Sequence, residues 1–99
     1  DGQWDILGDP AHKITSAILY RTEEVIACWT EITAPVLWVE ADDTDIWRWM
    51  GPKETARIEI DRRKAAIRNV RTEIIRNAGH MLHHDQPEAL AHLIEDFLR

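Results

Sequence analysis

The stretch VLWVEADDTD, residues 36–45, joins a predicted strand to an acidic loop. Its first six residues form a nearly continuous apolar run of strand length, which is typical of strands that are covered on both faces in parallel sheets. The pair Ala34–Pro35 comes directly before the run and ends any preceding helix. Asp42, Asp43 and Asp45 come directly after it. The stretch therefore predicts a strand of an α/β protein with carboxylates at its C-terminal end.

Helical and strand patterns alternate on both sides of this stretch. Apolar residues recur at helical spacing in residues 16–31, and residues 54–67 form a charged helix with a narrow apolar stripe. The segment VRTEIIR, residues 70–76, predicts a second strand, and an amphipathic helix follows it to the end of the chain. This order predicts the α/β class, with two parallel strands alternating with helices.

The start of the last helix carries a capping pattern. Asp85 is the expected N-cap, Glu88 follows three residues later as in a capping box, and Pro87 is tolerated in the first turn. We therefore expect this helix to begin at Asp85.

Two strands are too few for a stable parallel sheet, which needs neighbouring strands at its edges and helices on both faces. The local signals are nevertheless strong. We therefore expect the chain to be part of a larger α/β domain.

Composition narrows the classes of partner. The 99 residues are 44% hydrophobic and 30% charged, as in an ordinary globular protein. A net charge of -6 without a basic cluster argues against nucleic acid and anionic membrane surfaces. Cys28 is the single cysteine, and there is neither a membrane-length run nor a signal-peptide pattern. The default expectation is a reducing, cytoplasmic location, with no cofactor and no membrane contact.

A cluster of histidines lies between the second strand and the last helix. His80, His83, His84 and Asp85 fall within six positions, just after Gly79. The cluster could be a metal site, a catalytic histidine at a strand-to-helix turn, or a polar loop. Tetrahedral zinc takes ligands from separate segments, and no Cys or His partner is evident elsewhere, so we predict no metal. In parallel sheets, functional groups gather beyond the carboxyl ends of the strands, which favours a role for His80.

Two segments resemble the α/β-hydrolase family. ITAPVLWVEADDTD, residues 32–45, is similar to the strand that carries the acid of the catalytic triad. NAGHMLHHDQPEALAHLIEDFL, residues 77–98, is similar to the catalytic-histidine loop and final helix. The resemblance covers residues 30–99 well. It implies a C-terminal fragment of an α/β-hydrolase, with residues 1–32 as the end of a helical cap region and residues 33–99 as the C-terminal part of the core.

The resemblance implies that His80 is the catalytic general base. It assigns the acid to Asp43, with Asp45 as the next candidate and an acid from another strand as a third. The family often has G-x-x-D here, whereas this sequence has Ala41 in place of the glycine and Thr44 in place of that aspartate.

No nucleophile elbow accompanies these residues. The sequence contains no G-x-S-x-G, Ser16 is its only serine, and Cys28 lies within a predicted helix. We therefore expect the 99 residues to be inactive alone, and the parent protein to hydrolyse an ester or similar small molecule through a serine or aspartate nucleophile. The alternative is a non-catalytic α/β interaction or assembly module. Trp47 and Trp49 are expected either to line a substrate pocket or to pack against neighbouring structure. The oligomeric state is left open.

Overall fold

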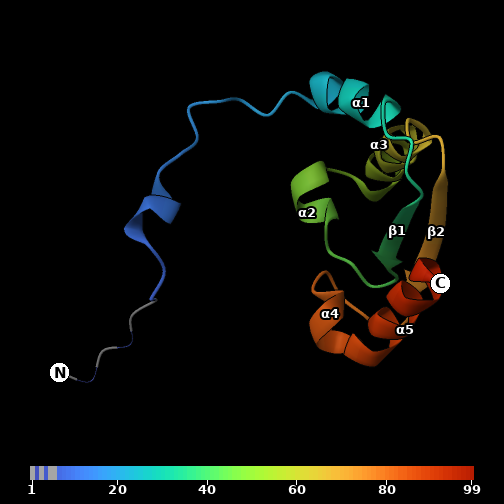
Figure 1. Ribbon diagram of the computed structural model, residues 1–99. Helices are drawn as coiled ribbons and strands as arrows, with labels where there is room; N and C mark the ends of the chain where they lie inside the picture. The colour runs from blue at the N-terminus through green and yellow to red at the C-terminus, as the bar shows by residue number, and fades with distance from the viewer. Residues whose placement is uncertain (1, 3, 5–6) are drawn as a thin grey trace.

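A computed structural model describes residues 2, 4 and 7–99. The sheet has two strands. Figure 1 shows helices flanking it, with the segment of residues 7–20 extending away from this body. The elements in chain order are a short 3-10 helix η1 (Pro10–Lys13), α1 (Thr22–Thr30), β1 (Val36–Ala41), α2 (Trp47–Met50), α3 (Lys53–Ala65), β2 (Val70–Ile75), α4 (Leu82–Asp85) and α5 (Pro87–Leu98).

The two strands form a parallel pair, as the sequence predicts. Val36 lies opposite Val70, and Ala41 lies opposite Ile75. The connection between the strands runs through α2 and α3, so the sheet is a β-α-β unit of the α/β class.

Helices cover the two faces of the sheet. On one face, Ala41 and Ile75 form a buried cluster with Ala78, against which α5 packs Leu90 and Leu93. The opposite face of β1 carries Glu40, which contacts α3. This division follows from the alternation of side chains along a strand. β1 is less covered than its apolar sequence suggests, since only Ala41 in it is buried.

The first long helix is shorter than predicted. The apolar spacing indicates a helix over residues 16–31, but α1 begins at Thr22. The Ser16 hydroxyl bonds instead to the backbone N–H and C=O of Ile18, a local turn that competes with helix formation. Ile18 and Leu19 are 84% and 81% exposed, so this segment has no apolar surface to pack against. An amphipathic pattern without a partner surface does not suffice to stabilise a helix.

The predicted capping box of the last helix is wrong. α4 ends at Asp85, and α5 begins at Pro87 after a break at Gln86, whose side chain forms no cap. The Asp85 carboxylate accepts a hydrogen bond from Gly79 N–H at 2.7 Å, so it is not available to cap α5. Pro87 does stand at the helix start, where its missing N–H costs nothing.

The chain is loosely packed for its length. Its Cα radius of gyration is 17.0 Å, whereas a compact chain of this length has about 13 Å. It exposes 8413 Å² of surface, whereas a compact monomer of this size exposes about 5800 Å². Few apolar residues are buried among those described, and most of them are alanines. They are Ala41, Ala56, Ile67, Ile75 and Ala78.

Candidate functional site

The site lies at the edge of the sheet where both strands end. Because β1 and β2 are parallel, the loops that follow them leave from the same edge. Asp42 N–H donates to Ile75 C=O at 3.1 Å, and Asp43 N–H donates to Ala78 C=O at 3.1 Å. In return, Ala78 N–H donates to the Asp42 carboxylate at 3.3 Å. These three hydrogen bonds hold the two loops together and set their mutual position.

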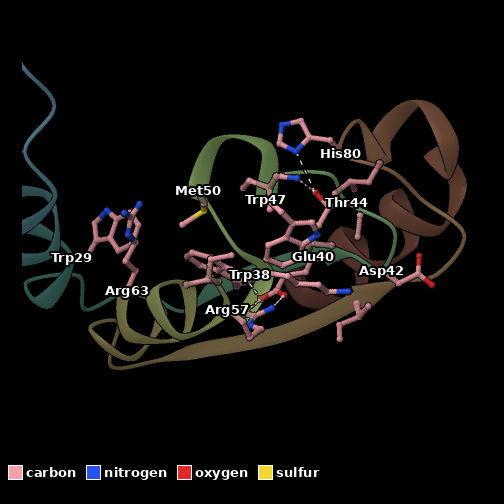
Figure 2. Close-up of a pocket in the computed structure, with 17 residues that line it drawn as sticks. Trp29, Trp38, Glu40, Asp42, Thr44, Trp47, Met50, Arg57, Arg63 and His80 are labelled. Atoms are coloured by element: carbon pink, nitrogen blue, oxygen red, sulfur yellow. Dashed lines mark hydrogen bonds and ion pairs between the residues drawn. The ribbon is translucent and has the colours of Figure 1, made fainter. Parts of the chain in front are cut away.

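His80 lies across this junction from Thr44. The His80 Nδ1 atom is 3.5 Å from Thr44 Oγ1, a contact between residues 36 positions apart. The Trp49 ring packs against the imidazole, with the ring centroids 5.4 Å apart. Figure 2 shows His80 reaching over the β1 loop toward Thr44. Within the described residues, Nε2 of His80 forms no hydrogen bond, so this nitrogen is available to another group.

The Thr44 side chain is itself held in place. Its Oγ1 accepts a hydrogen bond from Ile46 N–H at 3.3 Å, in a local turn that leads into α2. Ile46 is the residue before Trp47, the first residue of α2. The hydroxyl that faces His80 therefore has a position set by the backbone.

The predicted acids occupy different places. Asp43 joins the β2 loop through its backbone N–H. The carboxylate of Asp45 forms an ion pair with Arg48 at 3.4 Å. The structure therefore brings His80 together with Thr44 and records no hydrogen bond between His80 and the carboxylate of Asp43 or Asp45 among the described residues.

The turn that carries His80 depends on Asn77 and Asp85 as well as on Gly79. Asn77 has a φ of 55°, and Gly79 is not in that left-handed region. Gly79 instead gives room, because a Cβ there would lie 3.3 Å from the Asp85 carboxylate.

His83 and His84 make different contacts from those of His80. Both are exposed on α4, where their rings contact each other with centroids 4.2 Å apart. In the part of the chain that the structure describes, no group of three or more His, Cys, Asp or Glu side chains is arranged to hold a metal ion.

A cavity of about 510 Å³ opens beside the site. Trp38, Trp47, Met50 and Ile60 supply much of its apolar lining, and His80 and Thr44 stand at its border. Trp47 lines this cavity. Trp49 does not line it; it is 68% exposed and contacts His80.

The cavity lining includes Glu40 and Arg57, which belong to a charged network that the sequence analysis did not predict. The Glu40 carboxylate accepts hydrogen bonds from Arg57, from Lys64 at 3.1 Å and from the Trp38 indole N–H at 3.0 Å. The hydrogen bond from Arg57 is the main cause that lowers the pKa of Glu40 to about 2, and burial opposes this shift. The one signal in the sequence was an acid within an apolar strand that is followed by a helix rich in Arg and Lys.

Ser16 and Cys28, the serine and the cysteine of the chain, lie elsewhere. The Ser16 hydroxyl bonds to Ile18 within the N-terminal segment, and Cys28 is exposed on α1. Neither forms a hydrogen bond to His80.

Among the described residues, no helix is both long and apolar enough to cross a membrane. Comparisons with protein-family models, with curated proteins and with solved structures find no match to this chain.

Proposed function

We propose that this chain is the histidine-bearing C-terminal portion of an α/β-hydrolase that acts on an ester or a similar small molecule. In this proposal His80 is the general base, and the nucleophile and oxyanion hole come from chain outside the 99 residues. The observation that carries the proposal is the place of His80, directly after β2 at the carboxyl edge of the parallel pair, with Nδ1 facing the β1 loop. Functional groups of open parallel sheets gather at this edge.

The chemistry proposed for His80 follows from its two ring nitrogens. Nδ1 faces Thr44, and in the tautomer whose Nδ1–H donates to Thr44, Nε2 is the nitrogen that can receive a proton. Nε2 takes the proton of the nucleophile hydroxyl as that oxygen attacks the substrate carbonyl, and then gives the proton to the departing alcohol. A water molecule repeats the same two transfers and releases the acid. With an aspartate nucleophile, His80 instead activates the water that hydrolyses the covalent ester.

The cavity beside His80 supports a substrate with an apolar part. Trp47 and Met50 line it from α2, and Trp38 lines it from β1. Such a mixture of aromatic and apolar side chains next to a few polar groups is typical of small-molecule sites.

The test is turnover of aryl esters by the protein that contains this chain, compared with three histidine variants. His80→Ala is expected to lower kcat/KM by about 10³-fold or more, as when a triad member is removed. His83→Ala and His84→Ala are matched controls, since the same change is made on the same segment, and each is expected to have a far smaller effect. A chelator is expected to change nothing.

Two other results would change the proposal. Near-normal turnover by His80→Ala on an accepted ester would contradict the role of His80. Equal losses for all three variants, together with loss of activity in chelator, would indicate a metal site instead. If no ester is hydrolysed, alkyl halides and epoxides test the aspartate-nucleophile form of the proposal.

The second candidate is a non-catalytic interaction or assembly module. The exposed apolar side chains of the N-terminal segment favour it, with Ile14, Ile18 and Leu19 at 76%, 84% and 81% exposure. The upstream coding sequence separates the two candidates. An in-frame continuation with a nucleophile elbow supports the hydrolase, whereas a start codon just before Asp1 supports the module.

A further inference from the structure

We infer that Thr44 is the residue that positions His80, and that it does so with an uncharged hydroxyl in place of the carboxylates of Asp43 and Asp45. This inference deepens the proposed function and rests on it for its catalytic meaning. The contact itself is a property of these 99 residues and can be tested without any activity.

The side chains of Thr44 and His80 face each other across the two loops. Thr44 Oγ1 lies 3.5 Å from His80 Nδ1, at the long end of the hydrogen-bond range. Such contacts are often long without substrate and shorten when the complex forms. Thr44 is fixed by Ile46 N–H, and Trp49 packs against the His80 ring. The imidazole is thus approached by an anchored hydroxyl and by an aromatic ring, both from the segment after β1.

The proton between Thr44 and His80 can belong to either side chain. A threonine hydroxyl has one donor and two acceptor lone pairs. Ile46 N–H uses one lone pair, which leaves the O–H and the other lone pair for His80. If Nδ1–H donates to Oγ1, Nε2 is free to act as a base. If Oγ1–H donates to Nδ1, Nε2 carries the proton and cannot act as a base.

An ionised carboxylate can only accept hydrogen bonds. In the place of Thr44 it would therefore require Nδ1–H to be the donor, and its charge would stabilise the imidazolium. Thr44 permits both arrangements and adds no charge. The expected consequence is a histidine that is well placed but only partly in its basic tautomer, and an imidazolium that lacks a paired anion.

The carboxylates of Asp45 and Asp85, on the segments next to His80, have other partners. Asp45 is paired with Arg48 of α2, and the Asp85 carboxylate of α4 accepts from Gly79 N–H. The remaining titratable groups on the neighbouring segments are Asp42 and Asp43 after β1, Arg76 after β2, and His83 and His84 on α4.

The test compares three changes at Thr44 with two controls beside it. Thr44→Val keeps the shape and removes the hydroxyl, Thr44→Ser restores the hydroxyl, and Thr44→Asp adds a charge. Asp43→Asn and Asp45→Asn are the controls. The readouts are the ¹⁵N shifts of the two ring nitrogens of His80 and the pH midpoint of its titration in the 99-residue chain. Site-resolved carbethoxylation measured by mass spectrometry gives the same midpoint at nanomolar concentration, below the micromolar range in which association is expected.

We expect Thr44→Val to change the ring-nitrogen shifts of His80 while those of His83 stay the same, and Thr44→Ser to restore them. Thr44→Asp is expected to raise the titration midpoint of His80 by about one pH unit or more, since a nearby anion favours the charged ring. Asp43→Asn and Asp45→Asn are expected to leave the midpoint nearly unchanged.

A fall of about one pH unit in either asparagine variant, with no effect of Thr44→Val, would overturn the inference and return the role to that carboxylate. Turnover separates this outcome from a failure of the proposed function. If Thr44→Val changes His80 as expected but His80→Ala leaves turnover intact, the contact holds and the hydrolase proposal fails. If both hold, Thr44→Asp is expected to raise kcat more than KM changes.

Discussion

At the scale of single residues, the position of His80 depends on the tight turn that follows β2. Asn77 adopts a left-handed backbone angle, with φ at 55°, and its carbonyl accepts a hydrogen bond from the Gln86 side chain at 3.1 Å. Asparagine tolerates this region better than other non-glycine residues, whereas a β-branched residue there is strained. The turn therefore restricts position 77 more than position 79.

We predict that Asn77→Val loosens this turn and that Asn77→Gly does not. A β-branched side chain at this angle costs about 1–3 kcal/mol. The measurement is the protection of the Ala78 and Gly79 amides against hydrogen exchange. Arg76→Val is the matched control, because it makes the same kind of change one position earlier at an ordinary angle. An equal loss of protection in Arg76→Val and Asn77→Val would contradict the prediction.

The contact between Thr44 and His80 could not be predicted from the sequence. Thr44 stands at the position that the resemblance to α/β-hydrolases would give to the acid, and Asp43 and Asp45 lie on either side of it. Nothing in that order says which of the three faces His80. The answer depends on the course of the loop between Ala41 and α2, where Ile46 N–H anchors the Thr44 hydroxyl.

At the scale of secondary-structure elements, the docking of α3 on β1 depends on a charged contact. The Glu40 side chain is 17% exposed, Lys64 is 19% exposed and Arg57 is 37% exposed. Lys64 belongs to the charged run of residues 61–64 in α3, and its side chain reaches Glu40 on the sheet at 3.1 Å. Two cations in the helix hold one anion in the strand, so the charges compensate for partial burial.

We predict that Glu40→Gln weakens the docking of α3. The change removes the anion on the strand and leaves Arg57 and Lys64 with Asp61 of α3 as their remaining ion-pair partner. The expected cost is about 1–3 kcal/mol, between the values typical of exposed and buried pairs. Protection of α3 and β1 amides against hydrogen exchange should fall about tenfold, which corresponds to about 1.4 kcal/mol. Glu24→Gln is the control, because its ion pair with Arg21 is exposed on both sides. Equal effects of the two substitutions would exclude a special role for Glu40.

The same contact gives a signed pH dependence. The pKa of Glu40 is lowered from 4.5 to about 2 in the folded chain, mainly by the hydrogen bond from Arg57. Stabilisation by this contact is therefore fully present above about pH 4.5 and is lost as the pH falls toward 2. The difference in protection between the wild type and Glu40→Gln should narrow over this range. A difference that stays constant down to pH 2 would show that the Glu40 charge is not its source.

At the scale of the whole molecule, the fold leaves much of its apolar surface uncovered. The sheet has two strands, so each strand has one edge without a partner among the described residues. Ile74 on β2 is 61% exposed, and Leu98 at the end of α5 is 76% exposed. Exposed strand edges and apolar faces of this kind pair with other chains.

We predict that the isolated 99 residues associate or stay partly ordered. Light scattering should detect association at micromolar concentration, and circular dichroism should show a broad thermal transition, because a two-stranded sheet is marginal alone. Ile74→Lys is expected to delay association by placing a charge on the sheet. Ile58→Lys is the control, since Ile58 is similarly exposed, at 71%, on α3. A soluble monomer with a sharp cooperative melt would contradict the expectation of a larger domain.

The sequence alone determines the two strands, their parallel pairing, the charged helix and the polar loops at one edge of the sheet. Each of these depends on local periodicity, on breakers such as Pro35 and on the topology that alternating elements require. Only the tertiary structure decides where α1 begins, that α4 takes Asp85 away from the cap of α5, and that Thr44 meets His80. These features depend on which side chains meet across the fold, and periodicity within a segment carries no information about such contacts.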